Sequence, residues 1–154
     1  MLHLFLLAAI LQHSTAIGEF RSIQTFQCDF VGGGGFTFQD DGVDQEERVL
    51  NSPPDMYEDV RGLIFDSINY RTLRARSTSK TATETVTVIP GDRLVSFLAV
   101  TKTGIPTLTT IVRTPRPEGG RATHTYHAVR SYHLLLSIDG TKAWQLQGTC
   151  QARQ

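Results

Sequence analysis

Apolar and polar residues alternate with a period of two along most of the chain after residue 23. In residues 24–30, for example, Phe26, Cys28 and Phe30 fall on one face of an extended strand. Similar alternation recurs in later segments that are rich in Thr and Val. No segment has the 3.6-residue period of an amphipathic helix, so we expect an all-β protein.

Turn-forming residues separate about eight expected strands. Pro90, Gly91 and Asp92 have turn chemistry, and Asp139 followed by Gly140 is a strong hairpin signal. The four glycines at 32–35 are expected to break the chain, and residues 39–57 to form a long polar connection. The expected strands cover residues 24–30, 36–38, 60–65, 70–77, 83–89, 94–102, 107–113, 123–138 and 143–150. This spacing predicts a single antiparallel meander, either closed into a barrel or divided into a two-sheet sandwich.

The first residues have the pattern of a signal peptide. Residues 4–11 form an apolar block that is too short for a bilayer, which requires about 20 residues. Ser14 and Ala16 are small residues with the spacing of a signal-peptidase site, which predicts cleavage after Ala16. No later stretch is suited to spanning a membrane. The sequence thus predicts a signal peptide at 1–16 and a single all-β domain at 17–154, periplasmic or secreted.

Two cysteines, Cys28 and Cys150, lie far apart in this chain. In an exported protein an even number of cysteines favours a disulfide. A bridge requires the two Cα atoms to lie within about 7 Å of each other, which would make the first and last strands neighbours. We therefore favour the closed barrel over the sandwich. Two buried thiols and a metal pair remain alternatives, although neither cysteine has the Cys-x-x-Cys spacing of a metal site.

The composition is that of a globular domain, without a sign of a nucleic-acid partner. Hydrophobic residues make up 40% and charged residues 19%, and the formal net charge is zero. Charge is nevertheless divided along the chain. Residues 17–66 contain eleven acids and three arginines, whereas residues 67–154 contain four acids and twelve bases. The two parts either steer a charged partner or neutralise each other within the fold.

The densest group of polar and aromatic residues lies at 124–133. Alternation along a strand places the two tyrosines of this stretch on one face together with Arg130, and two of its histidines on the other. We predict an anion or small-ligand site here. Its expected residues are Tyr126, His127, Arg130, Tyr132 and His133.

An inward Arg130 would require an anion, because an unpaired internal charge is very costly. The sequence offers Asp29, Asp66 or the carboxylate of a bound ligand as partners. The remaining reading is that these side chains are ordinary strand residues whose polar ends satisfy each other or water.

Two catalytic readings of the same stretch are weaker. A metal site is disfavoured because His127 and His133 would lie about 20 Å apart on an extended strand. A Ser131 and His133 pair would need an orienting acid and an oxyanion donor, and no nucleophile-elbow motif surrounds Ser131. We predict no catalytic residue, metal or cofactor, and keep a small hydrolase or isomerase using residues 124–133 as a competing hypothesis.

Short motifs along the chain resemble those of a group of small exported proteobacterial β proteins to which no activity is attached. The shared motifs are an early Cys-x-Phe at 28–30, Ser-Phe-Leu at 96–98, Thr-Thr-Ile at 109–111, Ala-Val-x-Ser-x-His with its Ala and His at 128 and 133, and a final Gly-x-Cys at 148–150. The group has His and Arg where this chain has Arg130 and Tyr132. The resemblance implies export and a β fold. The early and late cysteines are also similar to those of bacterial lysozyme-inhibitor barrels.

Together these features favour a binding protein over an enzyme. We expect a monomeric exported barrel that binds a small ligand or an envelope protein. One alternative is inhibition of a cell-wall hydrolase, in which the acidic loop at 39–59 would face a cationic enzyme.

Overall fold

The computed structural model describes residues 20–39, 42–49, 61–100, 104–113, 125–136 and 140–153, with side chains throughout except at 35–39, 42–49, 132–136 and 140–142. These residues contain nine strands and the end of a short helix. The strands are β1 (Thr25–Gln39), β2 (Gly42–Val49), β3 (Arg61–Asn69), β4 (Arg74–Thr78), β5 (Thr83–Pro90), β6 (Leu94–Val100), β7 (Pro106–Arg113), β8 (Thr125–Leu136) and β9 (Gly140–Arg153). The expected all-β fold is confirmed.

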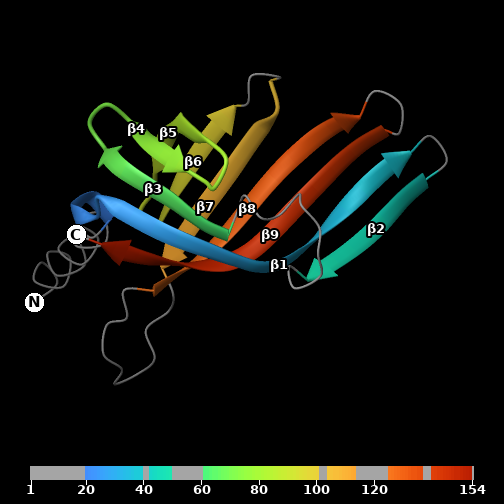
Figure 1. The fold of residues 1–154 in the computed structure, drawn as a ribbon, viewed down its shortest axis with the longest axis horizontal. Helices are drawn as coiled ribbons and strands as arrows, with labels where there is room; N and C mark the ends of the chain where they lie inside the picture. Colours follow the sequence, from blue (N-terminus) through green and yellow to red (C-terminus); the bar gives the residue numbers. More distant parts are fainter. Residues whose placement is uncertain are drawn as a thin grey trace, which may run out of the picture.

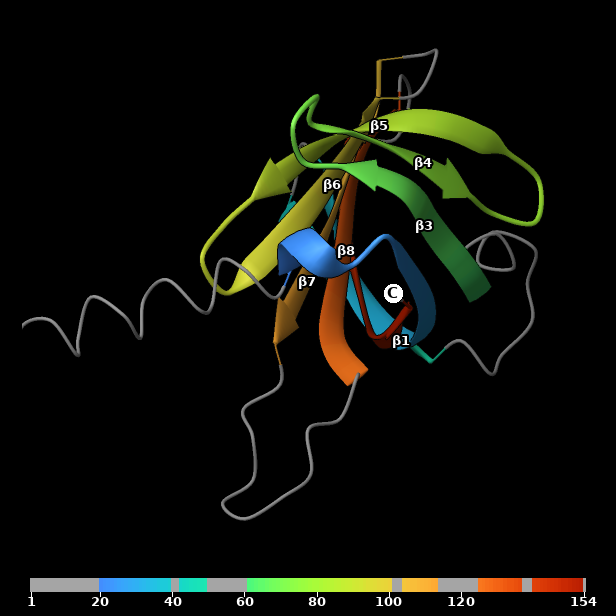
Figure 2. The ribbon, with the colours of Figure 1, turned by 90° about the vertical axis from the view of Figure 1, so that its left-hand side faces the viewer.

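Eight of the strands form a closed antiparallel barrel. From β3 to β9 each strand pairs with its neighbour in sequence, β1 pairs with β3, and β1 also pairs with β9 to close the ring. Figures 1 and 2 show the ring from the side and from one end. Closure was favoured over the two-sheet sandwich from the sequence, and the β1–β9 pairing confirms it. Because each edge is paired, the ring leaves no open edge for another chain to join.

Three strands continue beyond the ring. Residues 32–39 of β1 pair with β2 on one side and, over 32–38, with β9 on the other, and β8 follows β9 to their hairpin end. Together with β2 they form a sheet that extends from the barrel, in the order β2, β1, β9 and β8 (Figure 1). We call the barrel end that faces this sheet the distal end, and the end near residue 20 and the C-terminus the terminal end.

The glycines at 32–35 do not break the chain, contrary to the prediction, because β1 runs through them. At Gly33 a Cβ atom would collide with the backbone of Gln145 and Leu146 on β9. Gly148 lies equally close to the backbone of Asp29 and Phe30. These glycines therefore permit a close approach of two strands.

Two other expectations need correction. Within the predicted connection at 39–57, Gly42–Val49 is a strand, because its backbone pairs with β1; residues 50–60 lie outside the description. The strand expected at 70–77 begins only at Arg74. Residues 70–73 form a turn, in which the Asn69 side-chain oxygen accepts the N–H groups of Arg71 and Thr72 at 2.9 Å. Such an Asx turn overrides the strand propensity of the residues that follow it.

Aromatic rings fill the terminal half of the barrel. Phe26 is fully buried and meets the ring of Tyr126 edge-on at 5.5 Å. Phe65 and Phe97 stack with their centroids 4.1 Å apart. Phe20, in the helical turn that lies in front of the barrel in Figure 2, contacts both Phe26 and Tyr126. The helical turn thus seals the terminal end with apolar surface.

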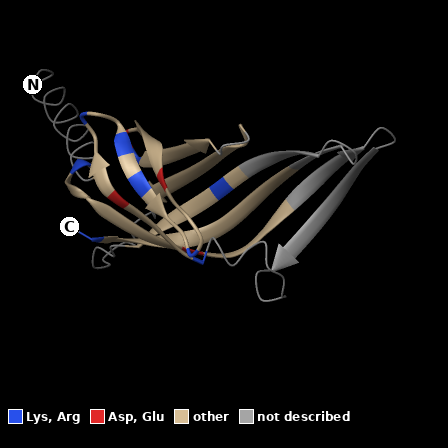
Figure 3. Cartoon of the chain, turned by 45° about the horizontal axis from the view of Figure 1, so that its top comes forward, with Lys and Arg blue, Asp and Glu red and all other residues tan. Residues whose placement is uncertain are grey.

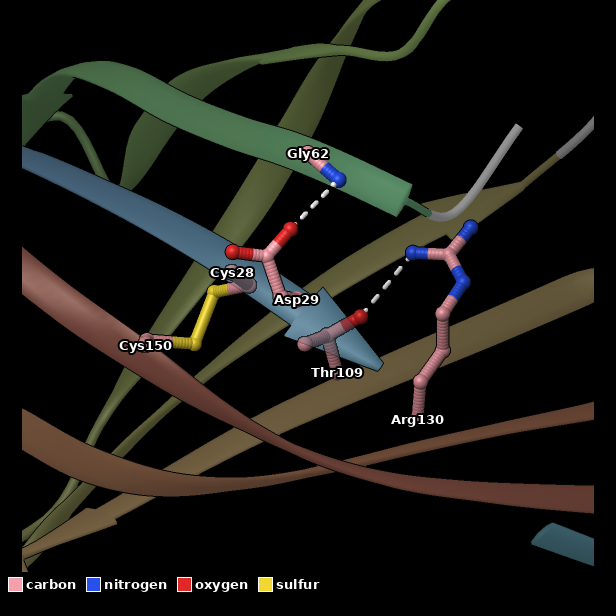
Figure 4. Close-up of a disulfide and its surroundings, with 6 residues drawn as sticks. All are labelled: Cys28, Asp29, Gly62, Thr109, Arg130 and Cys150. Carbon is pink, nitrogen blue, oxygen red and sulfur yellow. Dashed lines mark hydrogen bonds between the residues drawn. A yellow bond between two sulfur atoms is a disulfide. The ribbon is translucent and has the colours of Figure 1, made fainter. Parts of the chain in front are cut away.

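A disulfide joins Cys28 to Cys150, as expected. The two residues are register partners on β1 and β9, and both side chains are fully buried. The bridge therefore joins the first and last strands of the barrel (Figure 4).

The predicted signal peptide at 1–16 lies outside the described residues. Within the ranges that are described, no helix has the length and hydropathy needed to cross a membrane.

Candidate functional site

The inner face of strand β7 changes character along its length. Ile111, Thr109 and Thr107 follow one another toward the distal end, and all three are buried. They share one face because successive side chains on a strand point to opposite sides. The inner face of β7 is therefore apolar near the terminal end and hydroxylated near the distal end.

The inner faces of the neighbouring strands also change along their length: that of β6 ends in a small apolar residue and that of β8 in a charged one. On β6 the inner residues run from Val95 through Phe97 to Ala99, and on β8 they run from Tyr126 to Arg130. On β4 and β5 the distal inner positions are again polar. Among the described side chains, five polar ones face inward along these strands, and we call them the polar lining: Ser77, Glu84, Thr107, Thr109 and Arg130.

Arg130 is the cation of the polar lining. It is partly buried, lies opposite Thr109 in the β7–β8 ladder, and donates a hydrogen bond from Nη1 to Thr109 Oγ1 at 3.0 Å (Figure 4). Thr109 itself is 0% exposed. Because a guanidinium stays protonated at any ordinary pH, the structure holds a permanent positive charge on the inner face of the barrel.

The wall on the other side of Arg130 is apolar. Leu63, Phe30 and Leu146 are buried inward residues of β3, β1 and β9. Trp144, the single tryptophan of the chain, is buried on β9. Arg130 lies opposite Leu146, two positions from Trp144 on that same face, so Trp144 is a diagonal neighbour of Arg130. The distal half thus offers one polar and one apolar wall.

Neither carboxylate considered from the sequence lies on the inner face with Arg130. Asp29 is exposed, and its Oδ1 accepts the N–H of Gly62 at 3.0 Å (Figure 4). Asp66 forms an ion pair with the exposed Arg76 at 2.7 Å, and this hydrogen-bonded partner holds the pKa of Asp66 below its usual value. Among the strand residues that Figure 3 colours, Lys, Arg, Asp and Glu are few.

The residues predicted from the 124–133 stretch do not all meet. Tyr126 and Arg130 both face inward, but they lie four residues apart, about 13 Å along a strand. Tyr126 is 3% exposed and belongs to the aromatic core, whereas His127 is exposed on the outer face. The side chains of Tyr132 and His133 lie outside the description.

Arg130 is the one member of the polar lining that the sequence predicted; of the four that were missed, Glu84 and Thr109 have the clearest sequence signal. Both lie in strands that were expected. Each is two residues from a buried apolar side chain and so faces inward with it: Glu84 with Val86, and Thr109 with Ile111. The signal was therefore present in the period of two. It was not used because a lone acid or threonine in a strand is most often exposed.

In the terminal half, the hydroxyl of Tyr70 is a buried polar group with a shifted pKa. It is buried and has no hydrogen-bond partner among the described residues. Burial, with a smaller contribution from nearby Tyr126, raises the pKa of Tyr70 to about 12. This hydroxyl remains protonated throughout the physiological range and belongs to the packing of the core, since Tyr70 packs against it.

In the part of the chain that the structure describes, no three His, Cys, Asp or Glu side chains gather closely enough to hold a metal ion.

No family model, no curated protein and no solved structure matches the chain.

Proposed function

We propose that this protein is an exported binding protein that holds a small molecule with an anionic group in the distal half of its barrel. The observation that carries the proposal is the inward position of Arg130 beside the fully buried Thr109. A guanidinium matches the planar geometry of a carboxylate and is a frequent anchor for one.

The contrast between the two barrel halves supports a site at the distal end. An eight-stranded barrel is just wide enough either to be filled by side chains or to hold one small ligand. The terminal half is filled by the rings of Phe26, Phe65, Phe97 and Tyr126. On one wall of the distal half the inner residues are either small, such as Ala99, or polar. The opposite wall is apolar. Few, well-placed polar groups on an otherwise apolar lining are typical of ligand sites.

The proposal favours a small ligand over the other hypotheses from the sequence. The hydrolase-inhibitor hypothesis relied on an acidic loop at 39–59, of which Gly42–Val49 is instead a strand. The hydrolase or isomerase hypothesis relied on His127, His133 or Tyr126, of which His127 lies on the outer face and Tyr126 in the aromatic core.

Hexanoate is a suitable first probe, because it has one carboxylate and a short apolar tail. We expect hexanoate to change the fluorescence of Trp144 in the disulfide-bonded protein, and 1-hexanol to do so at least tenfold more weakly. Arg130→Gln should lower the affinity for hexanoate by about ten- to a hundredfold, since a hydrogen bond to a charged group contributes about 1.5–3 kcal/mol.

His127→Gln is the matched control, because it changes a nearby residue of β8 that faces outward. It should leave hexanoate affinity unchanged. Equal affinity of wild type and Arg130→Gln, or no binding measurable by calorimetry at millimolar hexanoate, would overturn the proposal.

A further inference from the structure

The polar lining contains a carboxylate as well as a guanidinium. Glu84 occupies the inward alternation of β5 with Val86 and Val88, and it lies in register with the buried Ser77 of β4. Like Arg130, it is partly exposed. Both charges therefore reach solvent from the inner face.

The two charged residues lie far apart within the polar lining. Glu84 belongs to β5 and Arg130 to β8, and two strands separate them on one side of the ring while four separate them on the other. In a ring of eight strands this places them across the interior from each other. A molecule between them would meet opposite charges at its two ends.

The ladders place the two residues at a similar height along the barrel. Through β7 and β6, Arg130 is in register with Val88 of β5. Glu84 lies four residues from Val88 toward the distal end. A row of register partners runs at right angles to the strands, so in strands tilted by about 40° a row that crosses three strands shifts by ~10 Å along the barrel axis. Four residues of a tilted strand cover about the same axial distance. The two shifts therefore bring Glu84 level with Arg130 when both point toward the distal end. The row of register partners that runs from Glu84 the other way, through β4 and β3, ends at Phe26 near the terminal end. The row from Val88 to Arg130 runs in the opposite sense around the ring, so it shifts toward the distal end.

We infer that the ligand of the distal half is a small zwitterion, with its carboxylate on Arg130 and an ammonium group on Glu84. This inference rests on the proposed function, because it assigns the second end of the same ligand. A carboxylate across the interior from Arg130 repels a simple anion and attracts a cation, so Glu84 acts as a specificity-determining residue. The hydroxyls of Ser77 and Thr107 flank the two charges on the polar wall.

The test compares hexanoate with the ω-amino acids glycine, 4-aminobutanoate and 6-aminohexanoate, measured by calorimetry on the disulfide-bonded protein. Hexanoate and 6-aminohexanoate have the same carbon chain, so their ratio isolates the contribution of the ammonium group. We expect one ω-amino acid to bind at least tenfold tighter than hexanoate, and the preferred length to report the distance between the two charges.

Glu84→Gln should reverse this preference. The ω-amino acid should lose at least tenfold in affinity, whereas hexanoate should bind equally well or better, because the repelling carboxylate has been removed. Asp92→Asn removes an exposed acid in the turn after β5 and is the control, for which no change is expected. A merely structural role for Glu84 would lower the affinity for both probes alike.

The failures of the two proposals can be told apart. Binding of hexanoate through Arg130, with no gain for any ω-amino acid and no effect of Glu84→Gln, would overturn the zwitterion and leave the anion site standing. Absence of binding for every probe would overturn both.

Discussion

The two halves of the barrel are built from the same strands and the same alternation, yet their inner faces differ in chemical character. Along β7 a buried isoleucine at 111 in the terminal half gives way to a buried threonine at 107 in the distal half. The terminal half gains free energy from apolar burial, whereas the distal half gives up some of that gain to place hydroxyls and charges inside. Departures of this kind from an apolar core are expected at functional sites.

The terminal half is also closed, which sharpens the contrast. Phe20 and Ile23 are nearly inaccessible, and both belong to the segment that precedes β1. They cover the terminal end from outside the ring. The sheet that continues β1, β8 and β9 beyond the barrel belongs to the distal end (Figure 1).

Loss of the disulfide should have the largest effect, because the bridge joins β1 to β9 between the two halves. It closes a loop with a sequence separation of 122, for which the chain-entropy model gives about 4–5 kcal/mol. A Cys28→Ala and Cys150→Ala double variant should therefore unfold at a lower urea concentration by nearly this free energy. Reducing agent should bring wild type toward the variant and leave the variant unchanged. An unchanged urea midpoint in the variant would contradict this account.

Two substitutions on β7 compare the halves directly. Ile111→Ala should destabilise by about 2–5 kcal/mol, the usual cost of deleting a buried aliphatic side chain. Thr107→Ala, on the same face two inward positions away, should cost about 1 kcal/mol or less, since it removes little apolar surface. Both values come from urea unfolding followed by Trp144 fluorescence. Equal losses would mean that the distal half is packed as tightly as the terminal half, and would weaken the case for a ligand site.

Tyr70→Phe should have the smallest effect at neutral pH, within about 1 kcal/mol, because the hydroxyl that it removes has no partner among the described residues. The variant should differ more at alkaline pH. The pKa of Tyr70 is raised from 10.0 to about 12, so its stabilisation is complete below pH 10 and is lost as the pH rises toward 12. Melting temperatures between pH 9 and 12 should thus fall less steeply for Tyr70→Phe than for wild type. Parallel curves would place Tyr70 in a more solvated position.

Much of the fold was predictable from local pattern. The strands at 83–89, 94–102 and 107–113 agree with β5, β6 and β7 to within a few residues in their described parts, because alternation and turn residues are local signals. The even count of cysteines favoured the bridge between Cys28 and Cys150, and the strand adjacency that a bridge requires favoured closure of the barrel; both are confirmed.

The course of β1 and the existence of β2 were decided by pairing between strands. Read alone, four consecutive glycines indicate a flexible break, and an acidic segment such as Gly42–Val49 indicates a loop. In the folded chain Gly33 is required by the close approach of β9, and β2 is held by the backbone of β1. Backbone pairing depends on what lies alongside, which no local window contains.

The alternation of the sequence determined which residues face inward, including Tyr126 and Arg130, and so it determined the chemistry available inside the barrel. The tertiary structure decided which of these residues meet. Strand tilt and ladder register bring Arg130 level with Glu84 from a strand three positions away, while Tyr126 on its own strand is left in the aromatic core. Periodicity sets the direction of a side chain, but only closure of the sheet sets its neighbours across the interior.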